Sequence, residues 1–529
     1  MQNLAFCGIL YGEFFQLGEE TLEENKKNTS YSLKKYIIWS VVCGLLFLVG
    51  FSVFVVCYWY ANTFDLEFKD LLYTLASPLK GTGDGTVSLI IRSCLPWVIG
   101  ATILYVGCAV LGALYVRHYR WFRRAGAIFC VIVLLGSMVF GWHALRLPGY
   151  IEAIMQKTTI YENYYVDPDK VGITADGEAK NLIYIYLESM ETTYADRANG
   201  GRQENSNYMP LLTDLAKNEL SFTDKTDGAL GGFHTPNGTG WTMAALLSTT
   251  SGIPFSFPVG ENGHNSMSER ETFASGLTTL GDILAEKGYR QAFLCGSDAT
   301  FGGRRNYFEQ HGNYEIFDLY TAREEGYIAK NYYDDWWGYE DYILYEIAKD
   351  KLTEFAAGDT PFNFTMLTVD THHVDGHRCE LCGYEYGDGK SGSELLGNVV
   401  SCADRQIAEF IEWCKTQEFY EDSVIIVTGD HPRMDTTLID GTPYYDRTIY
   451  NCFINAAVEP EGSTSGRVFT SFDLFPTTLA AMGFSIEGER LGLGVNMFSG
   501  MPTLAEELGY SHLNSEISKF SDYYIREFS

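Results

Sequence analysis

The sequence has few basic residues for its length. Its 529 residues hold 38 Lys and Arg against 68 Asp and Glu, which gives a formal net charge of −30. The shortage is confined to the later part, because residues 151–529 hold 26 basic and 59 acidic side chains. So acidic a surface repels polyanions, which argues against nucleic acid or another anionic polymer as a partner held by bulk charge. An acidic surface is compatible with a soluble domain that is exposed to cations.

Long apolar runs are missing after Leu145, but three occur before it. They cover Tyr36 to Tyr60, Ser93 to Val116 and Ala125 to Leu145, and none of them contains Asp, Glu, Lys or Arg. Each reaches the roughly 20 residues that an α-helix needs to cross a bilayer. The first begins too late and runs too long for a cleavable signal peptide. We therefore predict three transmembrane helices at 36–60, 93–116 and 125–145.

The positive charges predict the orientation of these helices. Residues 117–124, between the second and third runs, hold four Arg and no acid, and loops of this kind stay in the cytoplasm. The N-terminus then lies inside, in agreement with Lys34 and Lys35 before the first run. We expect a multi-pass protein of the plasma membrane, with a cytoplasmic segment 1–35, a membrane domain 36–147, a connector 148–180 and an extracytoplasmic domain 181–529.

Cysteine is present, but without the pattern of a common metal site. Cys379 and Cys382 form a CxxC pair, and the second pair that a structural zinc site normally needs is missing. Outside the cytoplasm this pair favours a local disulfide over free thiols. Cys402, Cys414 and Cys452 show no readable role.

Apolar, β-prone runs alternate with helical stretches in the exported part. The runs are 182–187, 291–294, 362–369 and 423–428, and the helical stretches include 277–287 and 401–416. This alternation predicts an α/β domain with a mainly parallel sheet covered by helices on both faces. Ligands bind such sheets at the carboxyl ends of the strands.

Potential metal ligands stand directly after three of these runs. Glu188 follows the first, His372 and His373 follow the third, and Asp430 and His431 follow the fourth. Glu188 alone could be a helix cap, but together with Asp430 and His431 it forms a ligand set without thiolate. Such a set suits one divalent ion, Mn²⁺ or Mg²⁺, with Zn²⁺ as a further possibility.

Thr242 is the candidate nucleophile. It follows a Gly-rich loop, 228–240, and opens a run that reads as a helix. The N-terminus of a helix presents unpaired N–H groups that suit phosphoryl oxygens, and a metal ion would lower the pKa of the hydroxyl. A threonine in this position taken alone is more often a helix N-cap.

Six ordered motifs resemble those of the sulfatase-like phosphoglycerol transferases, the relatives of lipoteichoic acid synthase and of the periplasmic-glucan phosphoglycerol transferase. The likeness covers roughly residues 180–500, and the motifs read YLESM, GTGWTMAALLSTTSGIP, CGSDATFGGRRNYFEQHG, DDWWGYED, LTVDTHHVDG and VTGDHPRMDTT. GTGWT and LTVDTHHVDG are closest to the glucan-modifying branch. The three apolar runs differ from the five spans usual in lipoteichoic acid synthases.

This resemblance implies a role for each candidate residue. One metal ion is expected to be bound by Glu188, Thr242, Asp430 and His431, with Thr242 as the nucleophile. His372 falls where the family keeps a substrate-binding or proton-transferring histidine, and His373 is its rival.

The same resemblance extends to the recognition of glycerol. Arg304 matches the arginine that contacts the phosphoglycerol group, with Arg305 as an alternative. The synthases keep a Trp two residues before that arginine, where this sequence has Gly302. Trp241, beside the candidate nucleophile, could form a wall of the glycerol site in place of that Trp, or could simply belong to the core.

These observations lead to one functional hypothesis and several rivals. The hypothesis is transfer of glycerophosphate from phosphatidylglycerol in the bilayer to an envelope glycan, or to polyglycerolphosphate, through a covalent glycerophospho-Thr242. Related sulfatases carry a Cys or Ser in a C/S-x-P-x-R motif, which the run after Thr242 lacks. The rivals are a phosphoethanolamine transferase, a phosphodiesterase, and a non-catalytic membrane-bound lipid or glycan sensor.

Overall fold

The computed structural model describes residues 38–64, 68–69, 71–72, 85–115, 119–175, 177, 179–257, 272–332 and 337–528. The chain forms two compact units. The first comprises residues 1–61 and 87–145, and the second comprises residues 62–86 and 146–529.

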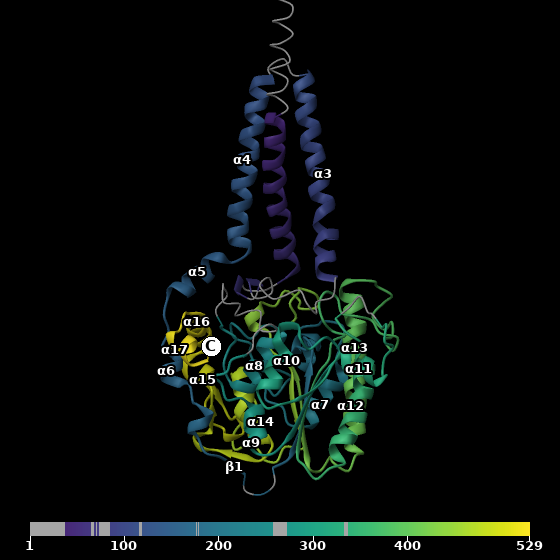
Figure 1. Ribbon diagram of the computed structural model, residues 1–529, viewed down its shortest axis with the longest axis vertical. Coiled ribbons are helices and arrows are strands. Elements are labelled where there is room, and N and C mark those ends of the chain that lie inside the picture. Colours follow the sequence, from purple (N-terminus) through teal and green to yellow (C-terminus); the bar gives the residue numbers. More distant parts are fainter. Residues whose placement is uncertain are drawn as a thin grey trace, which may run out of the picture. The chain divides into compact units, whose positions relative to one another are not determined.

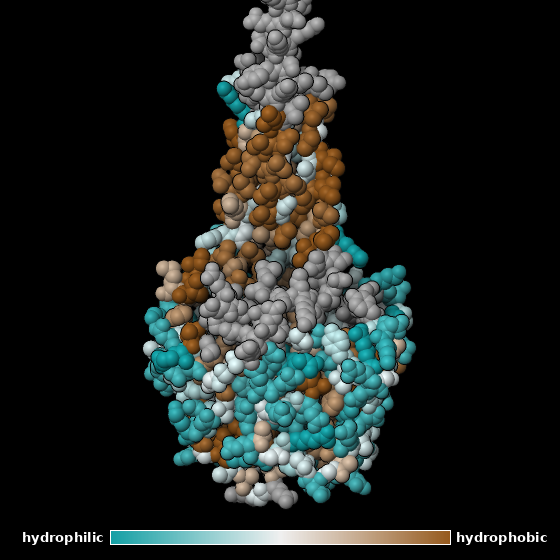
Figure 2. Space-filling view, viewed as in Figure 1, coloured by the Kyte–Doolittle hydropathy of each residue, from teal (hydrophilic) through white to brown (hydrophobic). Residues whose placement is uncertain are grey.

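Helices make up the first unit. Three of them are long and apolar enough to cross a membrane, at Ile38–Thr63, Ile90–Leu111 and Arg124–Ala144. The second lies within α3 (Gly85–Tyr115) and the third within α4 (Tyr119–Ala144). Their outward side chains are hydrophobic, as the brown surface in Figure 2 shows. Three apolar helices are thus confirmed, with ends that differ from the predicted ones by a few residues.

The second unit includes the segment expected to be a connector, residues 148–180. It contains α5 (Leu147–Met155), α6 (Ile160–Tyr164) and β1 (Ile173–Ala175). β1 pairs antiparallel with β8 (Phe484–Ile486), and α6 buries Ile160 and Tyr161 in the core. This stretch is therefore folded onto the second unit along most of its length.

A six-stranded sheet forms the centre of the second unit, in the order β4-β3-β5-β2-β6-β7. The strands are β2 (Asn181–Leu187), β3 (Arg290–Cys295), β4 (Glu315–Phe317), β5 (Phe362–Leu367), β6 (Ser423–Gly429) and β7 (Asn451–Ile454). All neighbours run parallel except β6 and β7, which are antiparallel. Each of the four predicted apolar runs is a strand of this sheet, so the predicted fold class is confirmed.

Helices cover both faces of the sheet (Figure 1). One face packs against α8 (Thr242–Ser251), α9 (Leu280–Glu286), α10 (Arg304–Gln310), α14 (Leu474–Ala481), α15 (Leu504–Leu508), α16 (Tyr510–Ser518) and α17 (Asp522–Phe528). The other packs against α7 (Pro210–Asn218), α11 (Leu319–Glu325), α12 (Asp341–Ala356) and α13 (Gly392–Lys415).

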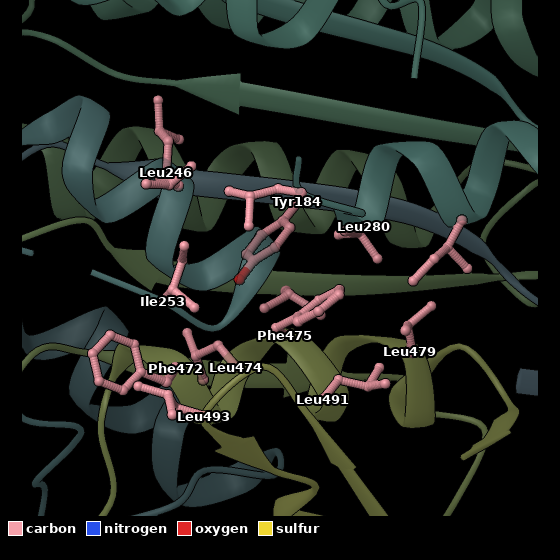
Figure 3. Packing of buried hydrophobic residues seen from close by; sticks show 14 of the residues in the cluster. Tyr184, Leu246, Ile253, Leu280, Phe472, Leu474, Phe475, Leu479, Leu491 and Leu493 are labelled. Atoms are coloured by element: carbon pink, nitrogen blue, oxygen red, sulfur yellow. The ribbon is translucent and has the colours of Figure 1, made fainter. Parts of the chain in front are cut away.

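The side chains of β2 show why this strand is central. Successive residues of a strand point to opposite faces, so Tyr184 and Tyr186 enter one core and Ile183 and Ile185 enter the other. Figure 3 shows Tyr184 among leucine and phenylalanine side chains that come from α8, α9 and the C-terminal elements. An apolar strand buried on both faces explains the nearly continuous hydrophobic run in the sequence.

Candidate active site

Three predicted metal-binding residues meet at the carboxyl ends of adjacent strands. β2 and β6 are parallel neighbours, and Leu187 stands opposite Gly429, so Glu188 and the Asp430–His431 pair leave the sheet side by side. The Nε2 atom of His431 lies 3.3 Å from Asp430 Oδ2 and 3.6 Å from Glu188 Oε1. One ligand atom from each of the three residues lies within 4.8 Å of the other two. All three side chains are buried.

Hydrogen bonds hold these ligand atoms in place. Ser189 donates its backbone N–H to Asp430 Oδ1 at 2.7 Å and its hydroxyl to Glu188 Oε1 at 2.7 Å. His431 Nδ1 lies 2.8 Å from the carbonyl oxygen of Pro432, which fixes the proton on Nδ1 and leaves the Nε2 lone pair facing the carboxylates. Asp430 Oδ2 is buried and accepts no hydrogen bond from the described residues.

The burial and the close spacing of the charges in this cluster shift the pKa values of Glu188 and His431. Burial raises the pKa of Glu188 to about 7, and the charge of Asp430 adds to that rise. Burial alone would lower the pKa of His431, but the charges of Asp430 and Glu188 outweigh it and raise the pKa. Two buried carboxylates around one imidazole lone pair therefore form a site that favours a cation.

The residues present fit a divalent ion. An unpaired buried carboxylate oxygen, a second carboxylate and an oriented imidazole are ligands for Mn²⁺, Mg²⁺ or Zn²⁺, and no thiolate competes. When bound, such an ion lowers the pKa of a nearby hydroxyl and neutralises charge on a phosphoryl group.

Thr242 lies next to this cluster. It is the first residue of α8, and its hydroxyl lies 3.4 Å from Glu188 Oε2 and 3.4 Å from His431 Nε2. Its predecessor Trp241 has extended backbone angles and occupies the N-cap position, so Thr242 is not the cap. The hydroxyl thus stands where unpaired N–H groups of α8 and the predicted metal ligands converge.

A buried ion-pair network lies behind the cluster, and the sequence patterns did not indicate it. Arg433 pairs with Asp435 at 2.6 Å, and Arg447 pairs with Glu191 at 3.2 Å, with all four side chains buried. Arg447 donates to the carbonyl oxygen of Arg433, and Arg433 donates to that of Thr371. The network therefore links the turn after β6 to the loop that carries the histidine pair.

His372 and His373 lie in that loop within a row of aromatic rings. Their rings stack with centroids 4.2 Å apart, and Trp337 packs 4.3 Å from His372. Phe64 contacts His373 edge-on at 5.8 Å and forms a β-bridge to Asp435. Trp337 and Phe64 come from distant parts of the chain, and sequence reasoning gave neither a place here.

Both histidines are neutral at physiological pH. Burial lowers the pKa of His372 well below its usual range, and the charge of His373 adds to this effect. Burial also lowers the pKa of His373, to about 3. His372 Nδ1 lies 2.8 Å from the carbonyl oxygen of His373, so Nδ1 carries the proton and Nε2 is the basic nitrogen.

The two arginines of the GGRR segment have different partners. Arg304 donates to the Ser297 hydroxyl at 3.0 Å and to two carbonyl oxygens of the same loop. Arg305 donates to Asp318 at 2.7 Å and forms an ion pair with Glu309. Arg305 is therefore committed to two carboxylates, which leaves Arg304 as the better candidate for a phosphate ligand.

Gly302 and Trp241 lie next to each other. Gly302 has φ 66°, a backbone conformation that favours glycine, and a Cβ atom built on it would lie 3.6 Å from the Trp241 ring. The indole therefore occupies the space toward which a side chain at position 302 would point. Trp241 also packs against the buried Phe255 with ring centroids 4.9 Å apart, so the position fits a core aromatic as well as a wall of the site.

The CxxC pair is not a disulfide in this structure. The Sγ atoms of Cys379 and Cys382 are 3.5 Å apart, and Cys402 is the third member of the group, 3.8 Å from Cys379. The predicted local disulfide is therefore wrong for this structure, because it ignored a cysteine that approaches from a helix.

Comparisons with known proteins identify the family of this chain. The family model described as Sulfatase matches residues 180–484, which is more than half of the chain. This chain belongs to the sulfatase family. Among curated proteins it is 27% identical over 430 residues to phosphoglycerol transferase I of Xanthomonas campestris pv. campestris, covering 78% of this chain and 56% of that one. Phosphoglycerol transferase I of Salmonella choleraesuis is 29% identical over 470 residues, covering 87% and 56% respectively. The chain thus spans just over half the length of the curated relatives it matches.

Solved structures match this chain at lower identity and with TM-scores below 0.5. The lipoteichoic acid synthase LtaP from Listeria monocytogenes is 19% identical with a TM-score of 0.48, covering 62% of this chain and 79% of that chain. The integral membrane lipooligosaccharide phosphoethanolamine transferase A from Neisseria meningitidis is 13% identical with a TM-score of 0.47, covering 84% of both chains. The predicted kinship with sulfatase-like transferases is confirmed by the family match and the curated relatives.

Proposed function

We propose that this protein is a metal-dependent phosphoglycerol transferase that moves glycerophosphate from phosphatidylglycerol to an acceptor hydroxyl. The observation that carries the proposal is the Thr242 hydroxyl at the start of α8, 3.4 Å from both Glu188 and His431. Glu188, Asp430, His431 and Thr242 would hold one divalent ion, with Mn²⁺ as the first candidate. A nucleophile in this position is suited to phosphoryl transfer.

In the first step Thr242 Oγ1 attacks the phosphorus of the lipid. A bond from Oγ1 to phosphorus forms and the bond from phosphorus to the diacylglycerol oxygen breaks. The proton of the threonine hydroxyl ends on the released diacylglycerol, and a glycerophospho-threonine remains. Arg304 and the N–H groups at the start of α8 would face the phosphoryl oxygens during this step.

The second step returns Thr242 to its free form. An acceptor hydroxyl attacks the same phosphorus, the bond to Oγ1 breaks, and Oγ1 recovers a proton. The hydrogen bond from His372 Nδ1 to the carbonyl oxygen of His373 leaves Nε2 as a proton acceptor, which suits removal of the acceptor proton better than donation of a proton to diacylglycerol. We therefore assign His372 as the base of the second step, with His373 as its stacked support.

A lipid donor is supported by the three helices of the first unit, which are long and apolar enough to cross a membrane. A donor that is itself embedded in a bilayer fits a chain that carries such helices.

The acceptor is proposed from the motifs and the relatives. GTGWT and LTVDTHHVDG resemble the branch that modifies glucans, and the curated relatives are named phosphoglycerol transferase I. We therefore propose an envelope glycan as the acceptor, ahead of polyglycerolphosphate. The site would work on the outer side of the plasma membrane, with the N-terminus in the cytoplasm.

Headgroup transfer by the purified full chain in lipid nanodiscs tests this proposal. Phosphatidylglycerol labelled in its headgroup and phosphatidylethanolamine labelled in ethanolamine are supplied in parallel with Mn²⁺, with and without a glucan acceptor. We expect diacylglycerol from phosphatidylglycerol only, and label on the glucan. Thr242→Val, which keeps the volume and removes the hydroxyl, should lose both products.

Other outcomes would assign another function. Release of diacylglycerol from phosphatidylethanolamine alone would indicate a phosphoethanolamine transferase. Free glycerophosphate formed at the same rate with and without acceptor would indicate a phosphodiesterase. Binding of lipid without any turnover, in wild type and Thr242→Val alike, would indicate a sensor.

A further inference from the structure

A second group of metal-ligand side chains lies apart from the candidate active site. Cys379 and Cys382 belong to the loop between β5 and α13, and Cys402 lies on α13. All three are buried, and their sulfur atoms lie within 4.8 Å of one another. Nineteen residues lie between Cys382 and Cys402, so only the fold brings the third thiol to the pair.

The distances between the sulfur atoms distinguish two chemistries. A disulfide would hold two of them about 2.05 Å apart. Thiolates bound tetrahedrally to Zn²⁺ lie about 2.3 Å from the ion and therefore about 3.8 Å from one another. The separations found are 3.5 Å from Cys379 to Cys382 and 3.8 Å from Cys379 to Cys402, which match the second case.

The surroundings supply the support that thiolate ligands need. The side-chain amide of Gln406, one turn after Cys402 on α13, lies 3.2 Å from the sulfur of Cys402 and 3.8 Å from that of Cys379. Donors of this kind orient metal-bound thiolates. Tyr342 packs against the three thiols and limits their contact with water.

The loop that carries Cys379 and Cys382 also holds a buried carboxylate, Asp370. Both of its oxygens are buried and accept no hydrogen bond from the described part of the chain. Among the described residues, no ion pair joins Asp370 to Lys or Arg.

We propose that Cys379, Cys382 and Cys402 bind one Zn²⁺ ion as a structural site. On binding, each thiol releases its proton to solvent and forms a bond from sulfur to zinc, and a non-sulfur ligand takes the fourth position. The ion would tie the loop to α13. That loop begins with the histidine pair, and the N–H of His377 donates to the carbonyl oxygen of Asp370 beside it. The proposal does not depend on the reaction assigned to Thr242.

Zinc retention by the full chain in detergent tests the site. The parent protein carries Glu188→Gln and Asp430→Asn, so that the other cluster does not contribute metal. The protein is passed over a chelating resin, and its zinc content is then measured by elemental mass spectrometry. Cys402→Ser is compared with Cys414→Ser, a matched control because Cys414 is also buried on α13 but lies outside the group.

We expect one zinc ion per chain in the parent and in Cys414→Ser. The zinc content of Cys402→Ser should be lower by more than about tenfold. Replacement of zinc by Co²⁺ should give sulfur-to-cobalt charge-transfer absorption in the first two proteins only. If Cys402→Ser fails to fold, alkylation of the parent gives the answer instead. The three thiols should then resist iodoacetamide until a chelator is added.

Two results would overturn the proposal. One is a disulfide between any two of the three cysteines in peptides prepared from the isolated protein without reduction. The other is equal zinc content in Cys402→Ser and Cys414→Ser.

Discussion

Replacement of Asp430 by Asn should stabilise the protein without metal and destabilise it with metal. Asp430 Oδ1 accepts two backbone N–H bonds, from Ser189 and His431, and the amide oxygen of Asn can accept both. Its Oδ2 is buried, accepts no hydrogen bond from the described residues and lies close to the Glu188 carboxylate, so an amide group there removes a charge that repels Glu188.

The magnitude follows from the pKa of Glu188. A rise from 4.5 to about 7 corresponds to about 3 kcal/mol of penalty on the charged form, and burial is the larger cause. Loss of the Asp430 charge should therefore recover about 1 kcal/mol in the metal-free protein. Metal at about 100 times its Kd adds about 2.7 kcal/mol to the wild type, and Asp430→Asn should lose most of that gain.

The assay is thermal unfolding in detergent, followed by tryptophan fluorescence, with EDTA or with Mn²⁺. One kcal/mol moves the Tm of a domain of this size by about 2 °C. We expect Asp430→Asn to melt about 2 °C above wild type in EDTA and several degrees below it in Mn²⁺. Without metal, wild-type stability should also fall as pH rises from 4.5 through about 7, because the unfolded Glu188 ionises first.

Asp404→Asn is the matched control. Asp404 is equally buried and also accepts two backbone N–H bonds, but it lies between α13 and α7, outside the cluster. Its metal response should equal that of wild type. The reasoning is refuted if Asp430→Asn keeps the full Mn²⁺ stabilisation, or if it melts below wild type in EDTA.

Three further predictions follow from the same region. Arg447→Met leaves Glu191 buried without its ion partner and should lower the free energy of unfolding by about 3–5 kcal/mol in urea titrations, with partial recovery in Arg447→Met/Glu191→Leu. No recovery would mean that the pair is not coupled. The pH–activity profile of the transferase at saturating Mn²⁺ should show an apparent pKa below 6.5 on its acid side, because His372 must be neutral and its pKa is lowered. An apparent pKa at or above 6.5 would contradict the role of His372 as a base. Arg304→Lys should raise KM for the lipid about tenfold through loss of a charge-assisted hydrogen bond, while Arg305→Met should lower stability and leave KM unchanged. The reverse pattern would exchange their roles.

The fold and the ligand cluster follow from local patterns. Apolar runs predicted the strands, and Glu188, Asp430 and His431 directly follow two of them. The carboxyl ends of neighbouring parallel strands lie at the same edge of the sheet, so such residues come together whatever conformation the loops adopt. Prediction therefore succeeds where a side chain is placed by its own strand.

Contacts between distant loops could not be predicted in the same way. Cys402 lies on a helix with no local pattern that pairs it with the CxxC motif, and this omission led to the wrong disulfide. Trp337 and Phe64 reach the histidine pair from separate segments. Such contacts depend on how whole elements pack, which no short run of residues encodes.

Mass spectrometry of the peptide that contains Thr242 shows whether this residue forms the covalent intermediate. The full chain is incubated with phosphatidylglycerol and Mn²⁺, without acceptor, and quenched in acid within the first turnover. We expect a glycerophosphate adduct on Thr242 that disappears when acceptor is added, and none on Thr242→Val. An adduct on another residue, or diacylglycerol formed at the wild-type rate by Thr242→Val, would contradict this role of Thr242.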